Sequence, residues 1–376
     1  MKVAHVIISG EVAGGQMVCG QIIEALKKRG DEVLVVSPTA GAFTERLKQN
    51  NVSIYFIPFD KTYHFQNAFR LWRILKKERV DLVHTHGMVP MNVQARLASK
   101  WAGVPCISHI HIANVFNPNP IVRRYQMFLD NWTSGFSSKL IAVSQATRQS
   151  LVRQGIAGER IEVIPNGVRE NGTVHMSKEE VFKKLGISEN HSLIGMVGRL
   201  CPTKGQEEFL KSVAEVSRAI PNVIGVIIGK DTEFNGTYER RLRAISHELG
   251  LSKRVLFLGY QEDPRPYIHA MDFLILPSKV EGMPLVILEA MALKRAVVAH
   301  QVDGVSEVVE DGITGILVSP NAPQTLTLSI VKLLQNPSLS KKMGEAGFEK
   351  MRQFYSESRM SARVLELYDE LLSRGK

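Results

Sequence analysis

Residues 193–210 read LIGMVGRLCPTKGQEEFL: an apolar run, a connection rich in glycine and basic residues, and the start of a helical pattern. Leu193–Val197 is typical of a buried strand, and Gln206–Ala219 of an amphipathic helix. The same alternation of strand and helix runs through both halves of the chain. Strict alternation favours parallel sheets covered by helices on both faces, so the sequence predicts an α/β fold.

Short apolar runs mark the expected strands, and a break between them marks a domain boundary. A chain of 376 residues exceeds what one core usually spans, and apolar periodicity fades over residues 165–190. We expect an N-terminal domain (1–166), a linker (167–190), a second domain (191–350) and a C-terminal helix (351–376) that returns to the first domain. The expected strands are residues 3–9, 32–36, 53–57, 82–86, 106–111, 140–143, 193–197, 223–228, 255–258, 273–276 and 296–299.

Cysteine usage and hydropathy indicate the compartment. Cys19, Cys106 and Cys201 lie far apart and form no CxxC pair, which fits a reducing environment and argues against a disulfide framework. The N-terminal apolar run is too short for a signal peptide, and no run of 18 apolar residues predicts a membrane span. We therefore expect a cytoplasmic protein.

The positive charge is concentrated in the first half. The net charge is +10, and residues 1–169 hold 21 Lys and Arg against 11 Asp and Glu, so this half carries the whole excess. Such a half suits an anionic partner such as an acidic polymer, a lipid phosphate or a membrane surface. A basic surface without a target is an equal alternative.

Two basic-aromatic segments lie within that half. Residues 69–79 read FRLWRILKKER and residues 117–128 read NPNPIVRRYQMF. Such segments can rest on anionic lipid headgroups, which would place the protein peripherally at the inner face of the membrane. The alternative is that both are amphipathic helices packed on the sheet with their basic sides in water.

Two strand-to-helix connections are suited to phosphate. In SGEVAGGQ (residues 9–16), Gly14 and Gly15 allow close approach of an anion to the helix start, although such a turn also needs glycine for shape. In GRLCPTKGQ (residues 198–206), Arg199 and Lys204 lie at the carboxyl edge of the predicted sheet, where they can neutralise a diphosphate. The alternative for both cations is solvation in a loop.

A third stretch, EGMPLVILEAMA at residues 281–292, combines two carboxylates with a helix start. Glu289 follows Glu281 by eight residues, so we expect both to point along one side of the helix. Backbone N–H groups of Gly282–Val286 are suited to sugar hydroxyls and a phosphate. An N-cap acid and a surface acid are the plain alternative.

These motifs carry a resemblance. G-R-x(3)-K-G, PS-x(2)-EGMP-x(4)-EAMA and G-x(2)-E at Gly304–Glu307 resemble the retaining glycosyltransferases of family 4 (glycosyl transferases group 1). VDLVHTHG, GVPCISHIH and IEVIPNGV in the first half resemble the same family, and the similarity covers nearly the whole chain. The sequence departs from the family pattern at Lys294-Arg295-Ala296, where Gly-x-Pro is usual, and at Asp303-Gly304, where Gly-Gly is usual.

The resemblance implies a GT-B fold, in which two Rossmann-like domains with parallel sheets face each other across a cleft, and a metal-independent enzyme without a cofactor. Arg199 and Lys204 would hold the donor diphosphate, Glu281 the donor sugar and Glu289 the ribose. Gly15 would lie near the phosphates or the acceptor, and His111 would contact the donor sugar. The amides of Gly282, Met283, Pro284, Leu285 and Val286 would surround sugar and phosphate oxygens, with proline lacking an N–H.

The histidines allow a further site. His84 and His86, and likewise His109 and His111, are two residues apart on strands, so each pair points to one sheet face. Without a nearby carboxylate we expect no metal site. His111 is the expected cleft residue, and His109 replaces it if the strand register differs by two.

The expected activity is transfer of a hexose from a nucleotide-sugar, by default a UDP-sugar, to a lipid-linked or cell-surface glycan in polysaccharide biosynthesis. A nucleotide-sugar epimerase on the same fold is one alternative, but no set of acid and base carboxylates can be assigned to it. A basic anion- or nucleic-acid-binding protein is the other, suggested by the isoelectric point of about 9.4. No RNA-binding signature supports it, and we expect no nucleic-acid partner.

Overall fold

The computed structural model describes residues 1–59, 65–113, 116, 119–170 and 174–373. Parts of the expected linker (171–173), of the second basic-aromatic segment (117–118) and of the C-terminus (374–376) therefore lie outside the described residues. The chain forms two compact units. The first comprises Met1–Gly167 with Glu357–Lys376, and the second comprises Val168–Ser356.

The first unit is built on a seven-stranded parallel sheet in the order β3-β2-β1-β4-β5-β6-β7. Each of the strands expected in this half is present, and β7 was not expected. Three residues, of which only Ile161 is fully buried, give too short an apolar run to identify it. The strands are β1 (Lys2–Ile7), β2 (Glu32–Ser37), β3 (Ser53–Phe56), β4 (Leu82–His86), β5 (Cys106–Ile110), β6 (Lys139–Ala142) and β7 (Ile161–Val163).

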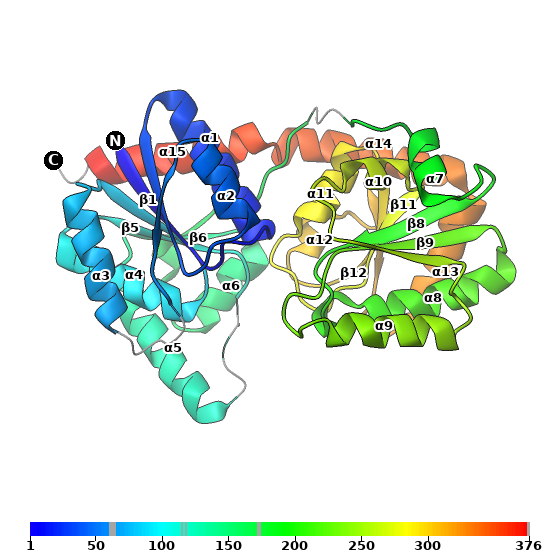
Figure 1. Ribbon diagram of the computed structural model, residues 1–376, viewed down its shortest axis with the longest axis horizontal. Coiled ribbons are helices and arrows are strands. Elements are labelled where there is room, and N and C mark those ends of the chain that lie inside the picture. The colour runs from blue at the N-terminus through cyan, green and yellow to red at the C-terminus, as the bar shows by residue number, and fades with distance from the viewer. Residues whose placement is uncertain (60–64, 114–115, 117–118, 171–173, 374–376) are drawn as a thin grey trace. The chain divides into compact units, whose positions relative to one another are not determined.

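Helices cover both faces of this sheet, as Figure 1 shows. Buried apolar side chains of β1, β2 and β4 pack against α3 and α4 on one face and against α1 and α2 on the other. The C-terminal helix α15 belongs to this unit and contacts α1. The helices are α1 (Gly14–Arg29), α2 (Ala42–Gln49), α3 (Phe65–Lys77), α4 (Val89–Ala102), α5 (Pro120–Ser134), α6 (Gln145–Arg153) and α15 (Glu357–Ser373).

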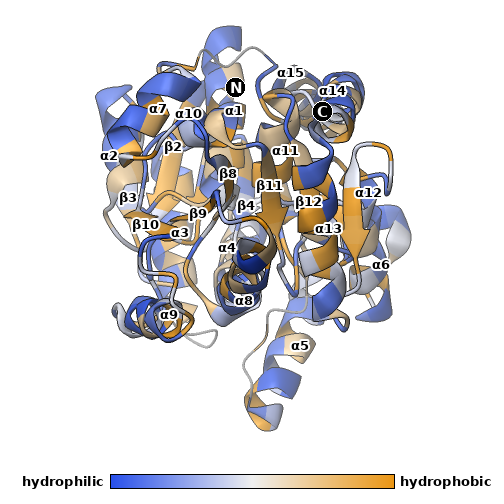
Figure 2. Ribbon diagram, turned by 90° about the vertical axis from the view of Figure 1, so that its right-hand side faces the viewer, coloured by the Kyte–Doolittle hydropathy of each residue, from blue (hydrophilic) through white to orange (hydrophobic). Residues whose placement is uncertain are grey.

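The second unit has a six-stranded parallel sheet in the order β10-β9-β8-β11-β12-β13. Its strands are strongly hydrophobic in Figure 2, as expected for a sheet buried on both faces. Of these strands, only β13 was not expected from the sequence, because it has four residues, begins with a glycine and is buried only at its two ends. The strands are β8 (Ser192–Val197), β9 (Val223–Ile228), β10 (Val255–Gly259), β11 (Phe273–Leu276), β12 (Ala296–His300) and β13 (Gly315–Val318).

Part of the expected linker is a helix of the second unit. α7 lies within residues 167–190 and packs against α10. Its start is a capping box in which Ser177 Oγ accepts from Glu180 N (3.2 Å) while Ser177 N donates to Glu180 Oε2 (2.7 Å). The helices are α7 (Lys178–Leu185), α8 (Gln206–Ala219), α9 (Thr237–Glu248), α10 (Arg265–Ala270), α11 (Leu285–Ala292), α12 (Val305–Val308), α13 (Pro323–Gln335) and α14 (Pro337–Phe354).

The last two helices divide where the sequence indicated a break, at Tyr355–Ser356. The change from second to first unit falls between Ser356 and Glu357, whereas the expected C-terminal segment began at residue 351, inside α14. Tyr368 of α15 is fully buried in the first unit, where its hydroxyl contacts Nδ1 of His84. Among the described residues, no helix combines the length and the apolar character that a membrane crossing needs.

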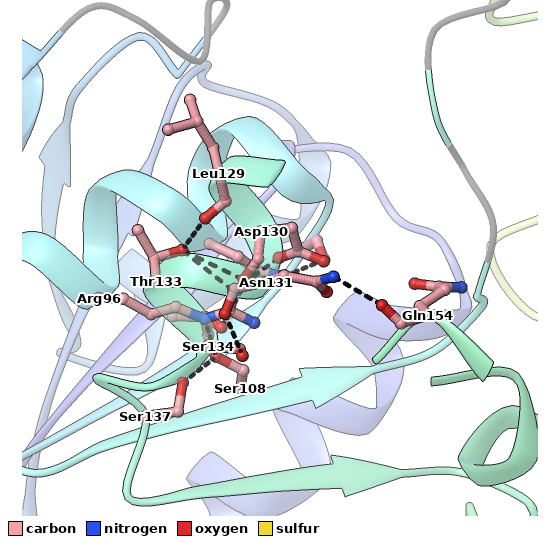
Figure 3. Close-up of polar contacts among 12 residues, drawn as sticks. Arg96, Ser108, Leu129, Asp130, Asn131, Thr133, Ser134, Ser137 and Gln154 are labelled. Atoms are coloured by element: carbon pink, nitrogen blue, oxygen red, sulfur yellow. Dashed lines mark hydrogen bonds and ion pairs between the residues drawn. The ribbon is translucent and has the colours of Figure 1, made fainter. Parts of the chain in front are cut away.

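A buried ion pair fixes α5 on the first unit. Arg96 of α4 is fully buried, and its Nη1 lies 2.6 Å from Oδ1 of Asp130. The same guanidinium donates to Ser108 Oγ (3.0 Å) and to Thr133 Oγ1 (3.4 Å), as Figure 3 shows. A charge this deeply buried depends on its partners, because it has no access to water.

Removing one partner should therefore be costly. We predict that Asp130→Ala lowers the free energy of unfolding of the first unit by about 3–5 kcal/mol, since Arg96 stays buried without its carboxylate. The tryptophans at 72, 101 and 132 all lie in the first unit, so their fluorescence in urea follows that unit. Glu366→Ala, which removes an exposed partner of Arg363, should cost at most about 1 kcal/mol. Equal effects of the two variants would contradict this.

Candidate donor site

The order in which strands are added to the second sheet reverses between β8 and β11. These strands are hydrogen-bonded neighbours, but the chain runs from β8 outward to β9 and from β11 outward to β12, on opposite sides. The carboxyl edge beside such a reversal of strand order is where open α/β sheets bind ligands. The expected cations follow β8, and the expected carboxylates follow β11.

The two loops are held in close contact by backbone. The loop after β8 ends in a short 3-10 turn, Pro202–Lys204, followed by Gly205 with φ of 76°. A Cβ on Gly205 would lie 2.0 Å from the carbonyl oxygen of Pro277, so glycine is needed both for this backbone angle and for the approach. Lys279 N donates to Thr203 O at 2.8 Å across the same gap.

Lys204 and Glu281 meet in this contact. Lys204 Nζ lies 2.6 Å from Glu281 Oε1, and the side chains are 20% and 9% exposed. The stem of Lys204 passes over Gly198. The backbone oxygen of Glu281 accepts from Gly304 N at 3.4 Å, which joins the loop after β12 to the same group. A buried carboxylate thus holds an ammonium group at the edge of the sheet.

Arg199 has a different partner, one that the sequence analysis did not identify. Its Nη1 forms an ion pair with Oε1 of Glu233, in the connection between β9 and α9, and the two side chains are 50% and 44% exposed. The main chain of Arg199 is fixed, because its carbonyl accepts from Gln206 Nε2 at 2.7 Å. An exposed pair of this kind contributes little to stability, so the guanidinium can exchange Glu233 for another anion.

The expected placement of both carboxylates along one side of a helix is wrong. α11 begins at Leu285, four residues after Glu281, so Glu281 lies in the loop and helical spacing does not apply to the pair. The N-cap position of α11 is Pro284, which makes no side-chain cap. The first amides of the helix are therefore directed into the connection without a side-chain acceptor, as an anion site requires.

Glu289 lies on the half-buried side of α11, with α10 as neighbour. Burial raises the pKa of Glu289 to about 7, while Arg265 acts to lower it and Asp263 to raise it. Arg265 is itself held by Asp263 through two bonds of 2.7 and 2.8 Å. Glu289 is thus a carboxyl that holds its proton more tightly than a solvated one, and no cation among the described residues contacts it as Lys204 contacts Glu281.

Both departures from the family pattern fall on left-handed backbone. Lys294 has φ of 56° and Asp303 has φ of 28°, although neither is glycine. The glycines usual at these positions would adopt such angles without a Cβ penalty. The turns are therefore formed in this chain despite the changed residues, at a cost in backbone strain.

In the first unit, Gly15 and His111 lie together. Gly15 is the second residue of α1, and a Cβ added to it would lie 3.1 Å from Cδ2 of His111. His111 directly follows β5, and its Nε2 lies 3.2 Å from Nδ1 of His86. β1 and β4 are the neighbours at which this sheet reverses its order, so the pair lies beside a second switch point.

The other histidines are interior. His109 is fully buried, so the strand register selects His111 as the edge residue. His86 Nε2 lies 3.1 Å from Nδ1 of His5, a histidine that the sequence analysis did not consider. Burial lowers the pKa of His5 to about 3 and that of His111 to about 4, so the rings are neutral near pH 7.

Two buried sets in this cluster bring potential metal ligands within 4.8 Å of one another: His5, Cys19 and His86, and His84, His86 and His109. Neither contains a carboxylate, and His86 is shared between them. The rings contact one another through hydrogen bonds and stacking, for example His109 on His111 at 4.4 Å. The expectation that no metal is bound or needed stays a prediction.

Comparisons with known proteins identify the family of this chain. Residues 177–350 match the model described as "Glycosyl transferases group 1", and residues 12–171 match "Glycosyltransferase Family 4". The D-inositol 3-phosphate glycosyltransferase of Corynebacterium glutamicum is 30% identical over 324 residues, which are 79% of this chain and 74% of the relative. The chain belongs to the group 1 glycosyltransferases of family 4. It is therefore an enzyme of the hexosyltransferase type.

Two further relatives of this glycosyltransferase cover nearly its full length. The UDP-Gal:alpha-D-GlcNAc-diphosphoundecaprenol alpha-1,3-galactosyltransferase of Escherichia coli is 27% identical over 354 residues, 90% of this chain and 89% of the relative. Anabaena HepE, solved in complex with UDP-glucose, superposes with a TM-score of 0.88 over 98% of this chain and 100% of its own, at 24% identity. The latter likeness supports the GT-B fold.

The raised pKa of Glu289 in the glycosyltransferase gives a test that needs no substrate. A carboxyl that holds its proton more tightly when folded loses stabilisation as pH rises from its ordinary value of 4.5 to about 7. We predict that the melting temperature of Glu289→Gln, which never ionises, rises relative to that of wild type between pH 4.5 and about 7. Above this interval the difference between the two melting temperatures should stay constant.

Calorimetric melting of both proteins from pH 4.5 to 8 would measure this difference. Glu189→Gln, at an exposed position of the same unit, is the matched control and should show no such trend. A difference between wild type and Glu289→Gln that does not change with pH would show that Glu289 ionises as freely as a solvated carboxyl.

Proposed function

We propose that this glycosyltransferase moves a sugar from a UDP-sugar to a lipid-linked or cell-surface glycan acceptor, with retention of anomeric configuration and without a metal ion. The contact of Lys204 Nζ with Glu281 Oε1 at the switch point of the second sheet carries this proposal. It joins the two motifs typical of a donor site at the edge where α/β sheets bind ligands.

Lys204 and Arg199 are assigned to the donor diphosphate. Lys204 is paired with Glu281, and Arg199 is paired with Glu233. A bound diphosphate therefore takes the place of these carboxylates as the anionic partner of both cations. Arg supplies a planar fork and Lys a compact charge, and together they cover two phosphate groups. The amides of Gly282–Val286 and the uncapped start of α11 add donors on the other side.

The two carboxylates take the hydroxyl groups of the donor. Glu281, displaced from Lys204 by phosphate, can accept hydrogen bonds from the hydroxyls of the sugar. Glu289 is assigned to the ribose hydroxyls, where a buried carboxylate gains most from two donors. In the first unit, the neutral His111 can contact the donor sugar, and Gly15 leaves room beside it for phosphate or acceptor.

The relatives support the choice of substrates. HepE was solved with UDP-glucose, and the Escherichia coli relative is named for a UDP-galactose donor and a diphosphoundecaprenol acceptor. A lipid-linked acceptor accounts for the positive charge of the first half, because lipid phosphates are anionic. We accordingly place the enzyme at the cytoplasmic face of the membrane as a peripheral protein. The three cysteines are free and buried, as a reducing compartment allows.

The reaction breaks the bond between the anomeric carbon and the diphosphate oxygen and forms one from the same carbon to the acceptor oxygen, on the same face of the sugar. The acceptor's hydroxyl proton passes to the departing diphosphate, so no protein nucleophile is required. Negative charge grows on the diphosphate as it leaves. Lys204, Arg199 and the amides at the start of α11 stabilise that charge, which is the role a metal ion would otherwise have.

Lys204→Ala tests the assignment of the diphosphate. We predict a fall in kcat of roughly 100- to 1,000-fold, because one preorganised charge at the leaving group is lost. Lys211→Ala, at an exposed position on α8, is the matched control and should keep wild-type turnover. Steady-state kinetics and melting curves separate catalysis from folding. Turnover near the wild-type rate in folded Lys204→Ala would refute the assignment.

The route of the reaction has its own test. We expect transfer from UDP-glucose or UDP-galactose to continue in excess EDTA, since the cations and amides meet the charge of the leaving group. NMR of the product should show the anomeric configuration of the donor. Activity that disappears with EDTA and returns with Mg²⁺ or Mn²⁺ would reject metal independence, and an inverted product would reject retention.

A further inference from the structure

α5 has an exposed apolar stripe. Ile121, Tyr125, Phe128 and Trp132 follow one another at intervals of four, three and four residues, so they lie on one side of the helix. Their exposed fractions are 80%, 41%, 67% and 52%. Four large apolar side chains along one side of a helix are more than scattered surface exposure, and such a stripe marks an interaction site.

The N-terminal half of α5 contributes no buried residue to the core. No residue from Pro120 to Phe128 is buried, and Figures 1 and 2 show the helix extending away from the sheet of its own unit. This half is nevertheless a well-formed helix. Asn119 Oδ1 accepts from Ile121 N (3.0 Å) and Val122 N (3.3 Å), and Pro120 occupies the first turn.

The C-terminal half is firmly attached, as Figure 3 shows. Asp130 is bonded to buried Arg96, and Asn131 Nδ2 donates to Gln154 O at 2.6 Å. Leu129 packs with Val93 and other apolar residues of α4. One end of α5 is thus anchored by a buried ion pair while the other presents an apolar stripe to solvent, so the exposure is a property of the fold and not of a frayed end.

The charges beside the stripe are basic. Arg124 is exposed beside the stripe, three residues from Ile121 and four from Phe128, whereas Arg123 lies on the opposite side of the helix. The only acidic residue of α5, Asp130, is occupied by Arg96. Residues 1–169, nearly all of which belong to this unit, carry the whole positive excess of the chain. Aromatic and aliphatic side chains flanked by arginine favour the interface of an anionic bilayer over a neutral protein surface.

We propose that α5 is the membrane-docking element of this enzyme, with Ile121, Tyr125, Phe128 and Trp132 inserted at the level of the lipid headgroups and Arg124 among the lipid phosphates. The choice of a bilayer as partner rests on the proposed function, because a lipid-linked acceptor lies in one. The docking makes the first unit the membrane-bound part of the chain.

Sedimentation with phosphatidylcholine vesicles, with and without phosphatidylglycerol, tests the proposal. The full-length protein should bind the anionic vesicles, less so at high salt. The double variant Ile121→Ser and Phe128→Ser should bind about tenfold more weakly or worse, since two exposed apolar side chains are lost. Arg124→Glu should also lose binding. Leu328→Ser, equally exposed at 66% but on α13, should bind as wild type.

The outcomes separate docking from catalysis. The Ile121→Ser and Phe128→Ser variant should keep wild-type turnover on a detergent-soluble acceptor and lose it on the same acceptor embedded in vesicles. Vesicle binding by a protein that transfers no sugar would leave docking in place and refute the proposed function. Equal binding by wild type and the stripe variant would overturn docking, as would a wild-type dimer in sedimentation equilibrium that this variant abolishes.

Discussion

The ion pair between Lys204 and Glu281 connects two loops that the topology of the second sheet would otherwise send apart. β8 and β11 are neighbours, but the loops after them lead to opposite sides of the sheet. Gly205 allows the backbones to touch, and the ion pair then joins the side chains above them. Taking two charges largely out of water gains little stability by itself, so the value of the pair lies in holding an ammonium group in place for an anion.

Much of this arrangement could be predicted from the sequence, because parallel sheets buried on both faces give near-continuous apolar runs. Those runs located the central strands, and the motifs between them located Arg199, Lys204 and Glu281. The elements that escaped are short or polar: β7 with three residues, β13 with four, and α7, whose signal is a capping box and not apolar periodicity.

Side-chain partners were harder to predict than positions. Glu233 lies 34 residues from Arg199, and its pairing depends on how the loop after β9 folds back. The same is true of Arg265 and Asp263 beside Glu289, which reach it only because α10 packs on α11. The spacing of Glu281 and Glu289 misled because helical geometry was applied to Glu281, which lies in the loop before α11. Long-range proximity of this kind is not encoded in local pattern.

The anchoring of α5 shows the same division between local pattern and tertiary contact. The sequence indicates an amphipathic helix here, but it leaves open whether the apolar side faces the sheet or the solvent. Arg96 decides this, since its buried pair with Asp130 holds only the C-terminal half against α4. The two ion pairs thus have comparable roles: one holds the ammonium group of Lys204 at the edge of the second sheet, and the other holds α5 so that its apolar stripe is exposed.

A crystal structure of the enzyme with an unreactive UDP-sugar analogue would show where the diphosphate binds. We expect it at the carboxyl edge of β8 and β11, bonded to Lys204 Nζ and the Arg199 guanidinium, with Glu281 turned to the sugar and Glu233 released. A diphosphate bound elsewhere, with the Lys204–Glu281 pair intact and facing no ligand, would contradict this expectation.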